Sequence, residues 1–259
     1  MQRKAFVCLS GGLDSTTALY LANQRFEGNV EAVSFDYGQR HRKEMEYARR
    51  SCDALKIKHT IVTLGGLLSG DGIMLTDASV VVPDIAYSDI KGVSPTYVPF
   101  RNGTMLAALA ALAQKYVMEQ IDKATNKKAM DLMGEKDRQM RFAKDLVTIY
   151  AGQHAEDAAN WAYPDCTFEF LGSMANAIYT GTYHTVRLET PFVFMSKEQI
   201  VRWGNELAVP YEDSWSCYKG EEFHCGTCPT CRSRMMAFAD AAVDDPTEYA
   251  AVESYDDKV

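Results

Sequence analysis

The order of apolar and polar positions along the chain predicts an α/β protein. Short apolar runs of strand length occur at residues 5–9, 30–35, 59–64, 146–151 and 186–188. Between them lie segments with apolar residues at helical spacing, among them residues 45–55, 102–116 and 168–178. Strands that alternate with helices favour a doubly wound, mostly parallel sheet that is covered on both faces.

Three further features of the pattern refine this prediction. Residues 102–116 are apolar almost all round, which predicts a buried helix. Ser196 and Gln199 have the spacing of a capping box at the start of another helix. In the connection of residues 65–99, only residues 79–82 resemble a short strand. A connection this long inside a compact domain is usually functional, so we expect it near the active site.

Shifts in composition indicate the domain organisation. Residues 122–145 contain seven Lys or Arg and five Asp or Glu, which predicts a charged helical insertion on the surface. Residues 1–209 are expected to form a nucleotide-binding α/β domain. Residues 210–259 are expected to form a smaller, helical, metal-binding part.

Charge and apolar content exclude several classes of protein. The 259 residues carry a formal net charge of −8, which argues against a broad basic surface for nucleic acid. Residues 105–113, the longest helical apolar run, have about half the length that a membrane span needs. No basic, apolar-cored leader opens the chain. We therefore expect a cytoplasmic protein that binds neither nucleic acid nor a membrane.

The Ser-Gly-Gly-Leu-Asp-Ser sequence of residues 10–15, called here the nucleotide loop, directly follows the first predicted strand. Glycines allow a positive φ and let backbone amides approach a ligand. Ser10, Ser15 and Thr16 add hydroxyl groups, and the N-terminus of the next helix favours an anion. Two glycines alone would indicate an ordinary turn. All six residues in order indicate a phosphate site that resembles the SGGxDS loop of PP-loop ATP pyrophosphatases and lacks the lysine of GxxxxGK[ST].

Four cysteines near the C-terminus have the spacing of a metal site. Cys217, Cys225, Cys228 and Cys231 form the pattern C-x7-C-x2-C-x2-C. Four thiolates complete a tetrahedral zinc shell and leave no open position, so the predicted metal is structural Zn²⁺. An iron–sulfur cluster also accepts four cysteines and is the alternative. His224 could replace Cys225, but with four thiols present it is expected to be a neighbour of the metal.

Three further strings extend the resemblance: FDYGQRH at residues 35–41, YVPFRN at 97–102 and YPDC at 163–166. Together with the nucleotide loop and the cysteines, they resemble the 7-cyano-7-deazaguanine synthase family of queuosine biosynthesis. The strings occur in the family's order and span residues 4 to about 240. The resemblance implies a Rossmann-like nucleotide α-hydrolase fold and a homodimer. It also implies an ATP-dependent ligase that converts 7-carboxy-7-deazaguanine and ammonia to a nitrile through an adenylated carboxylate and an amide.

Site roles follow from this resemblance. Asp14 and Arg101 are predicted to be catalytic, with Asp14 holding Mg²⁺ or only capping its helix. Arg101 is predicted to bind the substrate carboxylate or the ATP phosphates, the alternative being a solvated surface arginine. The predicted substrate-binding residues are Arg101, Asn102, Tyr163 and Asp165. The predicted ATP-binding residues are Leu9, Ser10, Gly11, Gly12, Leu13, Asp14, Ser15, Thr16, Asp36, Gln39 and Arg40.

Alternatives stay open near the predicted base pocket. Asp165 could read a guanine-like base or cap a turn, and Tyr163 could stack on the base or be a buried aromatic residue. Trp161, Ala162 and Thr167 depart from the family's usual residues, so an enzyme that stops at the amide or uses another amine is an alternative. A tRNA-modifying PP-loop enzyme and a silent zinc-knuckle binding protein are more distant alternatives.

Overall fold

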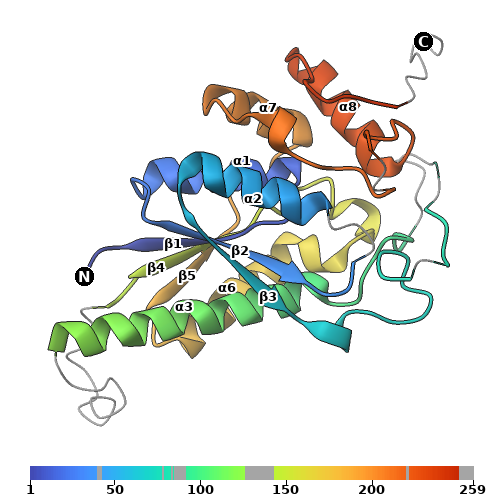
Figure 1. The fold of residues 1–259 in the computed structure, drawn as a ribbon. Coiled ribbons are helices and arrows are strands. Elements are labelled where there is room, and N and C mark those ends of the chain that lie inside the picture. Colours follow the sequence, from blue (N-terminus) through green and yellow to red (C-terminus); the bar gives the residue numbers. More distant parts are fainter. Residues whose placement is uncertain are drawn as a thin grey trace.

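A five-stranded, all-parallel sheet forms the centre of the protein (Figure 1). Each adjacent pair of strands is parallel, and the order across the sheet is β3-β2-β1-β4-β5. The strands are β1 (Lys4–Cys8), β2 (Val30–Asp36), β3 (Lys58–Thr63), β4 (Val147–Tyr150) and β5 (Val186–Glu189). This computed structural model describes residues 1–39, 43–77, 79–82, 84, 92–125, 143–219 and 222–250.

Helices cover both faces of the sheet, as the alternating pattern predicts (Figure 1). One face carries α1 (Leu13–Arg25), α2 (Lys43–Leu55), α7 (Lys197–Glu206) and α8 (Pro229–Ala241). The other face carries α3 (Arg101–Thr125) and α6 (Phe168–Gly181). The period of two along a strand divides the core between these layers. In β1, Phe6 packs in the core on the α3 side, whereas Ala5 and Val7 pack in the core on the α1 side.

Helix α3 is longer and less enclosed than the sequence predicts. Leu106, Leu109 and Ala113 are buried against the sheet, whereas Ala107 and Ala111 are exposed. The predicted burial holds for one side of the helix only, because the sheet covers only that side. Small alanines on the outer side leave little apolar surface in water, although they read as apolar in the sequence.

Two other local predictions have different outcomes. Residues 79–82 form no strand, and Val82 instead packs with Met74 beside the cysteine cluster. Ser196 and Gln199 form the predicted capping box at the start of α7. Of the predicted charged insertion, residues 126–142 lie outside the described part of the chain.

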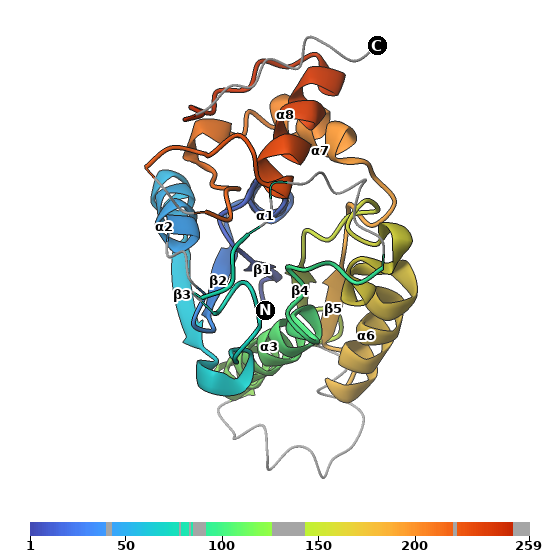
Figure 2. The same ribbon diagram turned by 90° about the vertical axis from the view of Figure 1, so that its right-hand side faces the viewer.

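The order of the strands places a ligand crevice between β1 and β4. The chain leaves β1 through α1 on one face and reaches β4 from α3 on the other, so connections diverge at this point. In open α/β sheets such a switch point, at the carboxyl ends of the strands, is where ligands bind. Figure 2 views the molecule from this end. In the described part of the chain, no helix is long and apolar enough to cross a membrane.

The C-terminal part packs on the α1 face. Ala237, Phe238 and Ala241 of α8 belong to the same apolar core as residues of α1 and α7. The division of the chain into domains at residue 209 stays a prediction.

Candidate active site and metal centre

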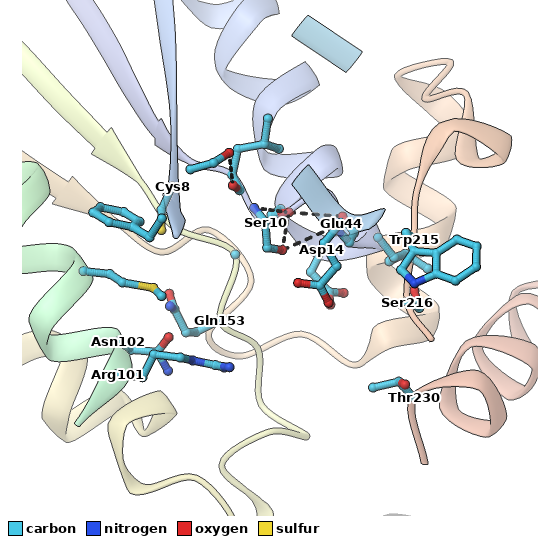
Figure 3. A pocket seen from close by; sticks show the side chains of 18 of the residues that line it. Cys8, Ser10, Asp14, Glu44, Arg101, Asn102, Gln153, Trp215, Ser216 and Thr230 are labelled. Carbon is cyan, nitrogen blue, oxygen red and sulfur yellow. Dashed lines mark hydrogen bonds between the residues drawn. The ribbon is translucent and has the colours of Figure 1, made fainter. Parts of the chain in front are cut away.

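A cavity opens at the carboxyl ends of the strands, beside the nucleotide loop. Its empty volume is about 1170 Å³ with the open mouth included. The wall combines the nucleotide loop, the start of α3, the segment after β4, the start of α7 and the segment around the cysteines. Figure 3 shows Arg101 and Asn102 on one side of the cavity and Ser216 and Thr230 on the other, with Ser10 and Asp14 between them.

Gly11 is the position in the nucleotide loop that requires glycine. Its φ is +89°, and a Cβ there would overlap the carbonyl oxygen of Glu44 and lie 2.9 Å from the amide nitrogen of Ala48. Gly12, by contrast, is extended and is the N-cap of α1, with φ −78°. The close approach of α2 to the loop therefore depends on the absence of a side chain at Gly11.

The hydroxyl groups of the loop bond to one another and to the loop backbone. The Oγ atoms of Ser10 and Ser15 share a hydrogen bond of 2.9 Å, and the amide of Gly12 donates to Ser10 Oγ at 3.3 Å. Leu9, Ser10, Gly12, Leu13, Asp14 and Ser15 line the cavity. Thr16 is fully buried and its Oγ1 lacks a hydrogen-bond partner among the described residues. The loop thus holds polar groups close to the place where an anion would bind.

Asp14 lies in an incompletely paired charged cluster. Its Oδ2 is 3.6 Å from Lys197 Nζ and 3.8 Å from His154 Nε2, and His154 Nε2 is 3.3 Å from Asp157 Oδ1. Within the described part of the chain, Asp14 Oδ1 and both ring nitrogens of His154 are buried without a hydrogen-bond partner. Because Gly12 is the N-cap, Asp14 does not cap α1. A carboxylate oxygen left unpaired beside a phosphate loop fits a Mg²⁺ ligand.

Lys197 is a cavity residue that the sequence reading missed. It is the first residue of α7, its side chain is 10 % exposed, and it lines the cavity. Burial alone would lower the pKa of its ammonium group, but Asp14, Asp157 and Glu156 raise the pKa above the ordinary value. Lys197 therefore stays charged beside the nucleotide loop. Its position directly after the capping-box serine was the one signal in the sequence.

Arg101 and Asn102 bring the start of α3 to the cavity. Arg101 Nη1 donates to the Tyr37 hydroxyl at 3.3 Å. Burial opposes the charge of Arg101, but neighbouring groups, led by Tyr37 and Tyr218, raise the pKa of its guanidinium. The Asn102 amide Nδ2 donates to Cys166 Sγ at 3.2 Å. Arg101 is thus a permanent cation in the cavity wall rather than a solvated surface residue.

Tyr163 and Asp165 lie next to this wall but do not line the cavity. Asp165 is 3 % exposed, and its Oδ2 accepts the backbone N–H of Asn102 at 2.9 Å at the start of α3. Tyr163 is buried, and its hydroxyl bonds to Ser94 and Thr96. Both side chains support the segment that carries Arg101. Their predicted contacts with the substrate base stay a prediction.

The unusual residues around Tyr163 do not line the cavity. Thr167 is the N-cap of α6: its Oγ1 accepts the amide of Phe170 at 3.3 Å and donates to the Pro164 carbonyl at 2.9 Å. Trp161 is 67 % exposed and does not line the cavity. These departures thus lie outside the cavity wall.

The remaining nucleotide-binding predictions concern the turn after β2. Asp36 is the last residue of β2, and its Oδ1 accepts the Gly38 amide at 3.2 Å. Gln39 lines the cavity while its side chain bonds to the backbone of Tyr37 and Phe35. Arg40 lies outside the described residues.

The described part of the connection of residues 65–99 lies near the active site, as expected, but outside the cavity wall: the Val98 carbonyl accepts the Arg101 amide at 3.2 Å. None of its described residues lines the cavity. Met74 and Val82 instead pack beside the cysteines, and Asp84 Oδ1 pairs with Lys219 Nζ at 2.7 Å.

The four predicted metal ligands converge. The sulfur atoms of Cys217, Cys225, Cys228 and Cys231 all lie within 4.8 Å of one another, and the four residues are buried. Cys225 Sγ and Cys231 Sγ are 3.9 Å apart. Two thiolates bound to one tetrahedral zinc at about 2.3 Å would be separated by a similar distance. The amides of Thr227 and Cys228 donate to Cys225 Sγ, which suits a thiolate. The donor set therefore fits a closed metal site.

His224 is engaged beside the cluster. Its Nε2 accepts the Ser216 amide at 3.0 Å, and its ring packs against Trp215 at a tilt of 40° with centroids 4.2 Å apart. In this arrangement it is a neighbour of the cysteines, as expected.

The cysteine cluster is joined directly to the nucleotide loop. The amide of Trp215 donates to the Gly11 carbonyl at 2.8 Å. Ser216, Tyr218 and Thr230, which are interleaved with the cysteines, line the cavity. The conformation of the cysteine segment therefore determines the position of one wall of the site. The sequence pattern did not reveal this link.

Comparison with known proteins agrees with this combination of features. The profile of a family described as "Queuosine biosynthesis protein QueC" matches residues 4–147 and 139–242. A 7-cyano-7-deazaguanine synthase of Caldicellulosiruptor saccharolyticus is 38% identical over 256 residues, which cover 98% of this chain and 99% of that protein. A 7-cyano-7-deazaguanine synthase of Porphyromonas gingivalis is 35% identical over 254 residues, which cover 96% of this chain and 99% of that protein. Among solved structures, an NMN synthetase from Francisella tularensis aligns with a TM-score of 0.42 and 14% identity, covering 94% of this chain and 79% of that one.

Proposed function

We propose, since this chain belongs to the family of queuosine biosynthesis protein QueC, that it forms 7-cyano-7-deazaguanine from 7-carboxy-7-deazaguanine, ammonia and ATP. The observation that carries the proposal is the meeting of three features in one cavity. These are the nucleotide loop, the Asp14–Lys197 pair and the Arg101 guanidinium. Together they supply a phosphate site and a separate cation for a carboxylate.

The first step is activation of the substrate. A carboxylate resists attack by ammonia, so one of its oxygens attacks the α-phosphate of ATP and pyrophosphate departs. The amides and hydroxyls of the nucleotide loop and the Lys197 ammonium group stabilise the departing charge, because they are arranged before the reaction. Arg101 holds the carboxylate, since its planar fork suits an anion with two oxygens.

Two further steps lead to the nitrile. Ammonia displaces AMP from the acyl adenylate and gives the amide. A second ATP activates the amide oxygen, and loss of that oxygen with AMP leaves the nitrile. The reaction is that of an ATP-dependent C–N ligase.

The metal ions have separate tasks in this proposal. Asp14 would hold Mg²⁺, which would neutralise the phosphates of ATP when bound. The four cysteines would hold structural Zn²⁺, which would keep the wall that carries Ser216 and Thr230 in place. We further propose, from the family resemblance, a cytoplasmic homodimer in which residues 1–209 bind the nucleotide and Tyr163 and Asp165 contact the base.

Mass spectrometry of the products tests the function. Incubation with 7-carboxy-7-deazaguanine, ATP, Mg²⁺ and ammonium should give the nitrile, AMP and pyrophosphate. Accumulation of the amide alone would replace the nitrile with an amide-forming function, and absence of turnover would refute the proposal. Elemental analysis of the same sample should find one equivalent of zinc, whereas iron and a brown colour would identify an iron–sulfur cluster.

A further inference from the structure

Glu44 is a carboxylate at the cavity to which the family resemblance gave no role. It lies in the first turn of α2, and its backbone carbonyl is the group that would collide with a Cβ at Gly11. Its side chain lines the cavity together with Ser10, Asp14 and Arg101. Figure 3 places it beside the nucleotide loop. Glu44 is therefore held by its backbone against the loop, with its carboxyl group at the reaction cavity.

The pairing of Glu44 differs from that of the other carboxylates in the cavity wall. Asp14 lies 3.6 Å from Lys197, and Asp157 lies 3.3 Å from His154. For the Glu44 carboxyl group, the described residues supply no hydrogen bond and no ion pair. Its carboxylate is attracted to Arg101 over a longer range, and its charge also raises the pKa of Tyr37. A carboxylate left without a fixed donor is available to take a proton from a ligand.

The environment of Glu44 adjusts its acidity for this task. Burial raises the pKa of its carboxyl group to about 7, although the charge of Arg101 acts in the opposite direction. A general base is most effective when its pKa lies near the working pH. At neutral pH a large fraction of Glu44 is ionised and each proton that it accepts is readily released.

The chemistry of amide formation requires such an acceptor. When the nitrogen of ammonia bonds to the acyl carbon, that nitrogen becomes positively charged and must lose a proton. The C–O bond to AMP then breaks, and AMP leaves with the electron pair. In contrast, the preceding adenylation step moves no proton, because the attacking carboxylate is already ionised.

We propose that the Glu44 carboxylate is the base that takes the proton from the attacking ammonia. This inference rests on the proposed function and adds the residue that performs its second step. After AMP has left, the protonated Glu44 returns its proton to water through the open mouth of the cavity.

The test separates the two half-reactions in the full-length protein. Adenylation is followed by exchange of labelled pyrophosphate into ATP, with 7-carboxy-7-deazaguanine present and ammonium absent. Amide formation is followed by mass spectrometry in a single turnover with ammonium. Glu44→Gln should retain exchange within about threefold and lose the amide-forming rate by about 10²-fold or more. Glu46→Gln is the matched control, because Glu46 lies on the same helical turn and is exposed.

The pH profile gives a second readout. In the wild type at saturating ammonia, the rate of amide formation should fall as pH decreases through about 7. In Glu44→Gln, this decrease of the rate at low pH should be absent. A variant that loses exchange and amide formation equally would overturn the proposal and make Glu44 a positioning residue for Arg101. Unchanged amide formation would also overturn it. If the wild type shows no pyrophosphate exchange that depends on 7-carboxy-7-deazaguanine, the result refutes the proposed function and does not test the role of Glu44.

Discussion

The two ends of the sheet contain buried charged clusters that differ in how completely they are paired. At the amino ends of the strands, Glu31 accepts hydrogen bonds of 2.8 Å from Lys4, Lys58 and Thr60. At the carboxyl ends, Asp14 has its charged neighbours at 3.6 and 3.8 Å and keeps one buried oxygen without a hydrogen-bond partner among the described residues.

This difference separates a structural cluster from a functional one. A buried carboxylate is costly unless hydrogen bonds satisfy it, and the Glu31 cluster meets that condition within the protein. Asp14 meets this condition only in part, because one of its oxygens has no partner in the protein and could bind a ligand. Both residues are acids near sheet strands in the sequence, and only their surroundings in the fold distinguish them.

The largest expected effect is on activity at the carboxyl end. Asp14→Asn keeps the shape of the side chain and removes the charge that we propose binds Mg²⁺. We expect the rate of pyrophosphate exchange to fall on the order of 10²-fold. The free energy of unfolding should change by less than about 1 kcal/mol, because the charged neighbours of Asp14 lie at 3.6 and 3.8 Å, beyond hydrogen-bond distance. If Asp14→Asn instead lowers stability while each folded molecule keeps the wild-type exchange rate, Asp14 has a structural role and not a functional one.

The next effect is on stability at the amino end. Glu31→Gln leaves Lys4, whose side chain is 13% exposed, without its partner at 2.8 Å. We expect the free energy of unfolding to fall by about 1–3 kcal/mol in urea titrations. The turnover of the folded protein should stay within twofold of the wild type. Lost turnover at unchanged stability would show that this cluster has a catalytic role.

The pH dependence of the same variant sharpens this test. Burial would raise the pKa of Glu31, but the hydrogen bonds from Lys4, Lys58 and Thr60 hold it below its ordinary value of 4.5. The contribution of Glu31 to stability is therefore complete above pH 4.5 and is lost as pH falls through the depressed pKa. The difference between wild type and Glu31→Gln should shrink only in that acid range.

The smallest effect concerns the exposed partner in the same cluster. The Lys58 side chain is 68% exposed, although its Nζ lies 2.8 Å from Glu31 Oε1. Lys58→Gln should cost only ~0.2–1 kcal/mol of unfolding free energy, because water screens exposed pairs. A loss of unfolding free energy as large as that of Glu31→Gln would show that solvent exposure does not decide how much each ion pair of this cluster stabilises the protein.

Much of the fold follows from local sequence. The runs at residues 5–9 and 30–35 form central strands because both faces of the sheet are covered, so continuous apolar sequence is required. The capping box at Ser196 forms from neighbours in the chain. The four cysteines converge because two of their gaps are short turns. Such features depend on residues close in sequence, which is why they were predicted correctly.

What the sequence alone determined about this protein is the identity of its chemical groups: the nucleotide loop, the Arg101 guanidinium and the four cysteines with the spacing of a metal site. The tertiary structure decided which groups share the cavity. It brought Lys197 and Glu44 to the cavity, placed Tyr163 and Asp165 behind its wall, and joined Trp215 to Gly11. The physical reason is that pairing and burial depend on residues far apart in the chain, and these are fixed only when the strands and helices pack.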